Sequence, residues 1–178
     1  MRLAPGHWRL LALVLALALG LAGAGVADAN GRKHRNKKEH AARWAPNPLH
    51  AQACGQCHMV YPPCLLPAAS WTKLLEGRGN HFGESLSLND AELREIKAFL
   101  ETNAADRAGG KRSRKIMSGL GSSTPLRPSE VPYLRHKHHD IAEAVFARPA
   151  VGGRGNCKAC HPGAEQGDYD EHRASIPR

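Results

Sequence analysis

The sequence predicts a mainly α-helical protein that consists of two small units joined by a linker or long loop. Three observations lead to this fold class. Residues 90–102 combine a helix-capping pair with apolar residues at helical spacing. A Cys-x-x-Cys-His string, whose spacing matches one helical turn, occurs once in residues 49–105 and again in residues 132–178. Residues 106–131 between them are rich in glycine, serine and proline, which mark loops.

The N-terminus has the three-part pattern of a secretory signal peptide. Residues 1–9 carry two arginines and no acid, residues 10–26 form a nearly unbroken apolar run, and Ala27-Asp28-Ala29 places small residues around one position. We therefore expect residues 1–29 to be removed by cleavage near Ala29 and the mature protein to be periplasmic. The alternative is an uncleaved membrane anchor, but the run is short for a span of ~20 residues and rich in alanine and glycine.

A basic segment follows the predicted signal peptide. The formal charge of the chain is +9, and much of the excess lies in Arg32, Lys33, Arg35, Lys37, Lys38 and Arg43. We predict that residues 30–48 are a disordered, solvated arm. Such an arm can bind nucleic acid, an anionic membrane or an acidic partner. An exported protein rarely meets nucleic acid, so we expect no nucleic-acid partner and at most a loose association with a membrane surface.

Local signals divide the rest of the chain. Prolines 62, 63 and 67 predict an irregular segment before a short helix at residues 70–76. Asn89 and Glu92 form a capping box for a helix at residues 90–102, whose apolar stripe we assign to core packing. Residues 104–132 predict a linker or long loop, residues 133–146 a helix, and residues 163–178 a polar tail without a clear period.

Four of the five cysteines form two Cys-x-x-Cys pairs, and a histidine directly follows each pair. The strings are Cys54-Gly-Gln-Cys57-His58 and Cys157-Lys-Ala-Cys160-His161. On a helical turn, residues i, i+3 and i+4 share one face. Two thiols at i and i+3 can therefore form thioethers with the vinyl groups of one haem, and the histidine at i+4 can bind its iron. The doubled string predicts two covalently bound haem c groups.

Three other interpretations of the cysteines are weaker. A four-cysteine zinc site leaves both adjacent histidines unexplained. A thioredoxin-like redox pair needs a βαβ pattern, which does not surround either string. A Cys-x-x-Cys disulfide closes only a very short loop. The fifth cysteine, Cys64, is left over, and we expect it to be a free buried thiol or an intermolecular disulfide partner without a catalytic role.

The residue on the far side of each iron decides whether the haem binds small molecules or only transfers electrons. Of the three methionines, Met1 is lost with the signal peptide, Met59 adjoins His58, and Met117 lies in the predicted linker. Histidine is therefore the better candidate. For the first haem we choose His81, in a loop between the two predicted helices.

The choice of second ligand for the other haem is less clear. If residues 133–146 form one helix, His138 lies on the apolar face with Leu134, Ile141 and Val145. We therefore choose His138, with His172 as the runner-up. His136 and His139 point elsewhere on that helix, and His34, His40 and His50 are expected to be solvated near the basic arm.

These motifs resemble the family of small exported dihaem cytochromes c, often called DHC. The resemblance rests on Cys54-Gly-Gln-Cys-His-Met-Val-Tyr-Pro-Pro, Leu65-Leu-Pro-Ala-Ala-Ser-Trp71 and His81-Phe-Gly-Glu84. In the second half it rests on His138, Arg148-Pro, Asn156-Cys-Lys-Ala-Cys-His161, Gly163-Ala-Glu-Gln-Gly167 and Ile176-Pro177. It covers most of the mature chain except the basic arm. Two departures are Cys64, where glycine is usual, and the histidine-rich segment around His138.

The resemblance implies a first domain like a class I cytochrome c and a second, less regular, loop-rich haem domain. It implies iron ligation by His58 with His81 and by His161 with His138. It further implies an electron carrier and not an enzyme, with a membrane cytochrome b or quinol as donor and a soluble oxygen-binding cytochrome c as acceptor. The alternative is a dihaem enzyme, a peroxidase or a protein that handles oxygen or nitric oxide, in which one iron has a single protein ligand.

Overall fold

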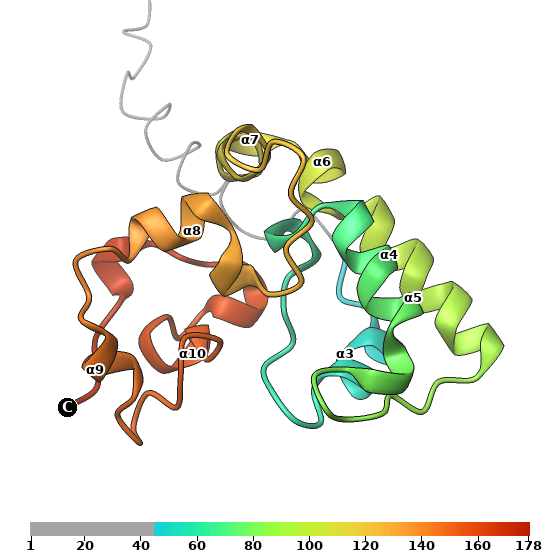
Figure 1. Ribbon diagram of the computed structural model, residues 1–178, viewed down its shortest axis with the longest axis horizontal. Helices are drawn as coiled ribbons and strands as arrows, with labels where there is room; N and C mark the ends of the chain where they lie inside the picture. Colours follow the sequence, from blue (N-terminus) through green and yellow to red (C-terminus); the bar gives the residue numbers. More distant parts are fainter. Residues whose placement is uncertain (1–44) are drawn as a thin grey trace, which may run out of the picture. The chain divides into compact units, whose positions relative to one another are not determined.

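The computed structural model describes residues 45–178 (Figure 1). The predicted signal peptide, most of the basic arm, His34 and His40 lie outside these residues. The α-helices are α3 (Pro48–Cys54), α4 (Ala68–Glu76), α5 (Asp90–Thr102), α6 (Ala105–Ala108), α7 (Gly110–Ser118), α8 (Pro132–Lys137), α9 (Glu143–Phe146) and α10 (Cys157–Cys160). The shorter 3-10 turns are η1 (Pro63–Leu65), η2 (Arg78–Asn80), η3 (Pro128–Glu130), η4 (Ala164–Gln166) and η5 (Glu171–Arg173). The described residues form no strand, which confirms the predicted mainly helical class.

Helix α3 begins inside the segment that we predicted to be the end of a disordered arm. The side chain of Asn47 accepts a hydrogen bond of 2.8 Å from the backbone N–H of His50, and Pro48 occupies the first helical position. Both features favour a helix start, since an N-cap satisfies a free N–H and proline has none to lose. Residues 47 and 48 therefore belong to the start of a helix, contrary to the prediction for them.

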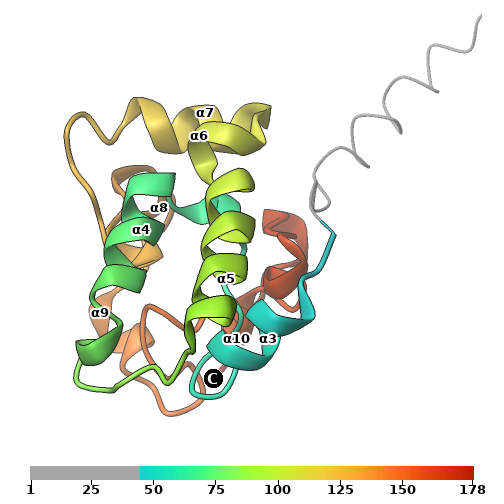
Figure 2. The ribbon, with the colours of Figure 1, turned by 90° about the vertical axis from the view of Figure 1, so that its right-hand side faces the viewer.

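Helices α4 and α5 lie side by side, and each contributes two residues to the core (Figure 2). The predicted capping box is present, because the Asn89 side chain accepts from the N3 backbone and Glu92 accepts from the Asn89 N–H at 2.9 Å. The indole N–H of Trp71 donates to the Pro63 carbonyl at 2.8 Å, which ties α4 to the irregular proline segment. The core consists of Leu66, Trp71, Leu75, Ile96, Leu100, Ala104, Ala105, Ile116, Leu120 and Val131.

The prediction of a linker or long loop at residues 106–131 is wrong for its first half, which forms most of α6 and all of α7. Gly109 and Gly110 both have positive φ, at 66° and 83°, so they make a turn between two helices. Ile116 of α7 is completely buried in the core. A high glycine content indicated a loop, but the glycines are confined to the ends of a helix that tertiary packing stabilises.

The predicted helix at residues 133–146 is also wrong, because it is two short helices. Helix α8 ends at Lys137, and α9 starts at Glu143. The ring Nδ1 of His138 lies 2.8 Å from the Leu134 carbonyl, which would accept the His138 N–H if the helix continued. The backbone N–H of His138 bonds to Arg135 instead, at 3.1 Å. A side chain that competes for a helical carbonyl favours the end of the helix.

The polar tail is fastened to the second Cys-x-x-Cys-His string. The N–H of Ser175 donates to the Cys160 carbonyl at 3.0 Å, and the Arg148 guanidinium donates to the Pro177 carbonyl at 3.0 Å. The tail contains only the 3-10 turns η4 and η5, as expected from its lack of a helical period.

Candidate functional site

The first Cys-x-x-Cys-His string begins at the last residue of α3. Cys54 ends the helix, and Gly55 follows as its C-cap. A Cβ at position 55 would lie 2.5 Å from the Ala51 carbonyl oxygen, so only glycine allows the chain to leave the helix here. The chain then bends sharply through Cys57 to His58. This local geometry keeps the thiols and the imidazole of the string in one small region.

The ring of His58 faces the ring of His81, and the two ring centres are 6.3 Å apart. A metal–imidazole bond is about 2 Å long and the bonding nitrogen lies about 1 Å from the ring centre, so two imidazoles across one metal have centres about 6 Å apart. The spacing therefore fits one iron between them. His58 Nδ1 lies 2.7 Å from the Met59 carbonyl and must carry the proton there, which leaves Nε2 free to bind metal.

The loop that carries His81 is held in a tight turn. The His81 N–H donates to the Glu84 carbonyl at 2.6 Å, and the Gly83 N–H donates to the Asn80 side chain at 3.0 Å. Phe82 has a φ of 58°, which is unusual for a bulky residue. The guanidinium of Arg127 lies 3.7 Å from the centre of the exposed Phe82 ring and covers it. This contact stabilises the strained residue next to His81.

Helix α10 is a single turn that contains the second pair of cysteines, and His161 is its C-cap. The His161 ring is 6.0 Å from the His138 ring, at an interplanar angle of 89°. This distance again fits one metal between two imidazoles. His138 Nδ1 faces the Leu134 carbonyl, so its Nε2 is free in the same way as that of His58.

Among the described residues, none of the other histidine candidates for the second site forms a ring pair with His161. His136 and His139 stack on each other with ring centres 5.2 Å apart, and both are exposed. His172 is exposed in η5. The structure therefore places His138 opposite His161, although the continuous helix on which we chose it does not exist.

Three cysteines of the two strings are half-buried, and their thiols are neutral. Burial raises the pKa of Cys54 and of Cys157 to about 11, and it also raises the pKa of Cys160. Low-pKa thiolates are typical of redox-active cysteine pairs, and these thiols differ from such pairs. None of the five cysteines forms a disulfide, and residues 45–178 contain no cluster of three or more potential ligands that a four-cysteine zinc site would need.

His50 and Cys64 are both buried. His50 was expected to be solvated but is only 4% exposed, with its ring 5.1 Å from that of Phe99. Burial, together with the nearby His58, lowers the pKa of His50 to about 4. His50 lies four residues before Cys54 on a helix with an N-cap, so the two side chains share one face of that helix. This spacing was the sequence signal that could have predicted its burial. Cys64 is a buried free thiol, which agrees with one of the two expectations for it, and burial raises its pKa.

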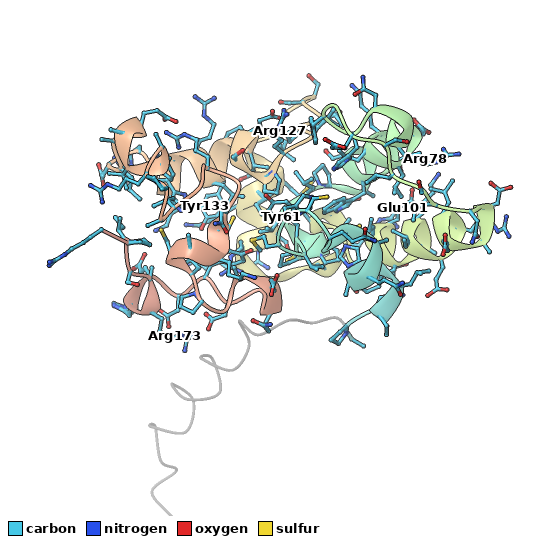
Figure 3. The ribbon with its side chains drawn as sticks, turned by 90° about the horizontal axis from the view of Figure 1, so that it is seen from below. Tyr61, Arg78, Glu101, Arg127, Tyr133 and Arg173 are labelled. Carbon is cyan, nitrogen blue, oxygen red and sulfur yellow. The ribbon has the colours of Figure 1, made fainter. Side chains whose placement is uncertain are left out.

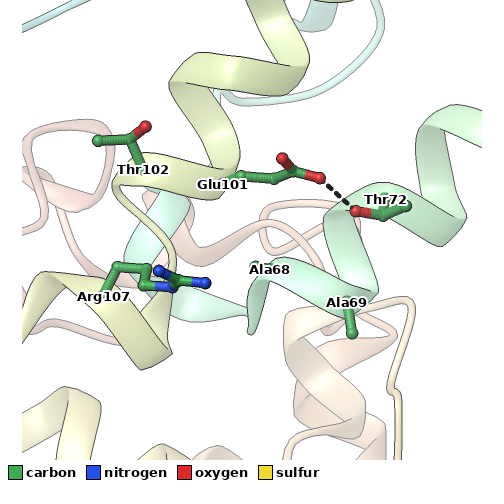
Figure 4. A pocket seen from close by; sticks show the side chains of 6 residues that line it. All are labelled: Ala68, Ala69, Thr72, Glu101, Thr102 and Arg107. Carbon is green, nitrogen blue, oxygen red and sulfur yellow. Dashed lines mark hydrogen bonds between the residues drawn. The ribbon is translucent and has the colours of Figure 1, made fainter.

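A shallow pocket lies away from these histidines, between the start of α4 and the end of α5 (Figure 4). Its lining residues are Ala68, Ala69, Thr72, Glu101, Thr102 and Arg107. The Thr72 hydroxyl donates to the Glu101 carboxylate at 2.5 Å across it. This bond joins the two core helices, so we assign the pocket a structural role.

A helical fold with two Cys-x-x-Cys-His strings, each facing a second histidine, defines a c-type cytochrome. The family model described as "Dihaem cytochrome c" matches residues 50–169, and the chain belongs to this family. The protein therefore has two covalently bound haem c groups and is an electron-transfer haem protein.

Solved structures of diheme cytochromes c from two organisms are similar to this chain. The diheme cytochrome c from Rhodobacter sphaeroides is 40% identical, with a TM-score of 0.63 over 72% of this chain and 100% of that chain. The diheme cytochrome type c from Shewanella baltica OS155 is 31% identical, with a TM-score of 0.61 over 75% of this chain and 95% of that chain. The search of curated protein sequences returned no match. No helix within residues 45–178 has the length and apolarity to cross a membrane.

Proposed function

We propose that this protein is a periplasmic electron carrier in which two histidines bind each haem iron. His58 and His81 bind the first iron, and His161 and His138 bind the second. The carrier accepts electrons from a membrane cytochrome or quinol and passes them to a soluble haem protein. The observation that carries the proposal is the spacing of the two facing imidazole pairs, 6.3 Å and 6.0 Å.

Some residues of the two sites attach the haems, and others tune their iron ligands. Cys54 with Cys57, and Cys157 with Cys160, hold the two haems through thioethers. Each bound haem supplies a reversible one-electron ferric–ferrous couple. The carbonyls of Met59 and Leu134 orient His58 and His138 and raise the basicity of their Nε2 atoms. Ligation of each iron by two imidazoles, without the methionine that raises the reduction potential, favours modest to low potentials.

Electron paramagnetic resonance of the oxidised, fully matured protein tests this assignment. The imidazole planes meet at 33° in the first pair and at 89° in the second. Imidazole planes that are closer to parallel split the iron orbitals strongly, whereas perpendicular planes leave them nearly equal in energy. We therefore expect two low-spin signals of equal intensity, a rhombic one from the first iron and a highly anisotropic one from the second.

A high-spin signal of one-haem intensity would contradict the carrier. Rapid and complete binding of carbon monoxide at one reduced haem would point to the alternative, a dihaem enzyme. Mass spectrometry of the matured chain provides two independent checks. It reports the added mass of two haems, and it shows whether cleavage occurs near Ala29 as export through a signal peptide requires.

A further inference from the structure

The segment that directly follows the first haem-attachment string contacts residues on both sides of the second string. The Tyr61 hydroxyl donates to the Gly155 carbonyl at 2.6 Å, and the Val60 N–H donates to the Glu165 carboxylate at 3.3 Å. Figure 3 shows Tyr61 between the cyan and green part of the ribbon and the orange and red part. Two adjacent residues thus connect parts of the chain that lie about a hundred positions apart in sequence.

Tyr61 makes one contact at each haem site. Its ring packs against the ring of His58, with centres 5.0 Å apart. Gly155, which accepts its hydroxyl, also accepts the N–H of Cys157 at 3.0 Å. A Cβ at position 155 would lie 2.8 Å from the Tyr61 hydroxyl oxygen, so the absence of a side chain there permits the close approach.

A second tyrosine occupies the matching place beside the other proximal histidine. The Tyr169 ring lies 5.4 Å from the His161 ring, and the Arg112 guanidinium lies 4.9 Å from the Tyr169 ring centre. Burial raises the pKa of Tyr169 well above its usual value and that of Tyr61 to about 12. Both phenols are therefore neutral, and each tyrosine ring packs against the histidine of one Cys-x-x-Cys-His string.

We propose that Tyr61 is a positioning residue that holds the two haem sites at a constant separation and orientation. Its ring supports the imidazole of His58, and its hydroxyl anchors the loop that delivers the first thioether cysteine of the second haem. The inference rests on the proposed function, since it takes His58 as an iron ligand. Electron exchange between two centres depends steeply on their separation, and no bond forms or breaks in it, so a constant spacing is what such a pair requires.

The test compares Tyr61→Phe with Tyr133→Phe in the fully matured protein. Tyr61→Phe keeps the ring beside His58 and removes only the bond to Gly155. Tyr133 is half-buried on α8 and serves as the matched control. Tyr61→Phe removes the hydrogen bond that holds the Gly155 loop. We therefore expect amide exchange across residues 152–157 to become about fivefold faster in Tyr61→Phe alone. We also expect a shift of the rhombic signal of the first iron and a changed difference between the two midpoint potentials.

Faster amide exchange without a shift in the rhombic signal or in the midpoint potentials would show a purely structural role and overturn the proposal. Wild-type behaviour in all three measurements would also overturn it. If Tyr61→Phe does not mature, Glu165→Ala removes the neighbouring bond to Val60 and should shift the same signals in the same direction. Its control is Lys158→Ala, which removes only the 3.6 Å ion pair of Glu165. A high-spin iron in the unsubstituted protein would refute the proposed function instead, whatever Tyr61 does.

Discussion

At the scale of single residues, backbone carbonyls decide which histidine nitrogen can bind metal. A carbonyl oxygen can only accept a hydrogen bond, so an imidazole nitrogen that faces one must carry the proton. The Met59 carbonyl does this for His58, and the Leu134 carbonyl does it for His138. In both rings Nε2 is the nitrogen that is left without a proton and can bind metal.

Substitution of His138 by alanine should leave the second iron with one protein ligand. We expect loss of the highly anisotropic low-spin signal, a new high-spin signal of one-haem intensity, and carbon monoxide binding by the reduced protein. His139→Ala is the matched control, because His139 is the adjacent, exposed residue that stacks on His136. The assignment of His138 fails if His139→Ala, and not His138→Ala, produces these changes.

The buried His50 should make the protein less stable in mild acid. Its pKa is 6.5 when unfolded and about 4 when folded, so the unfolded chain binds the extra proton first as the pH falls. Stability should therefore decrease between about pH 6.5 and pH 4, by up to about 3 kcal/mol from this group. Guanidinium unfolding of His50→Gln at several pH values should show a flatter dependence than the wild type.

The control for that measurement is His136→Gln, which replaces an exposed imidazole. It should keep the wild-type slope of unfolding free energy against pH. An unchanged slope in His50→Gln would mean that His50 takes up its proton in the folded protein as readily as in the unfolded chain.

At the scale of helices, local capping and tertiary burial contribute differently to α5 and α7. Helix α5 has a capping box and an apolar stripe, both of which are local sequence features. Helix α7 has no side-chain cap, and its sequence is strongly basic. Short helices are marginal in isolation, so α7 depends on the residues that it buries.

Ile116→Ala should therefore destabilise the protein strongly. Ile116 is completely buried in the core, and truncation of such a side chain leaves a cavity that costs about 3 kcal/mol. Arg114→Ala, on the exposed face of the same helix, should change the unfolding free energy by no more than about 0.5 kcal/mol. Equal effects of the two substitutions in denaturant unfolding would mean that residues 110–118 act as a linker after all.

At the scale of the whole molecule, the excess of positive charge should govern encounters with anionic surfaces. The formal charge is +9, and a large share of it belongs to the arm before the described residues. Replacement of Arg32, Lys33 and Arg35 by glutamine should weaken binding to phosphatidylglycerol vesicles by about 1 kcal/mol per charge at low salt.

Sedimentation with the vesicles measures this binding, and phosphatidylcholine vesicles are the control. Raising the salt concentration should abolish the difference between the wild type and the variant, since exposed charges are screened. Binding that is unaffected by both the substitutions and the salt would rule out the arm as an electrostatic contact.

The sequence alone was sufficient for the features that depend on neighbouring residues. The two Cys-x-x-Cys-His strings lie within five positions each, and the capped helix α5 follows from its own thirteen residues and the Asn89 directly before them. Only the tertiary structure decided which histidines face His58 and His161, that His50 is buried, and that α7 is part of the core. These outcomes depend on contacts between residues far apart in the chain. Local propensity does not determine these outcomes, because the burial of a residue and its distance from remote residues are set only when the helices pack.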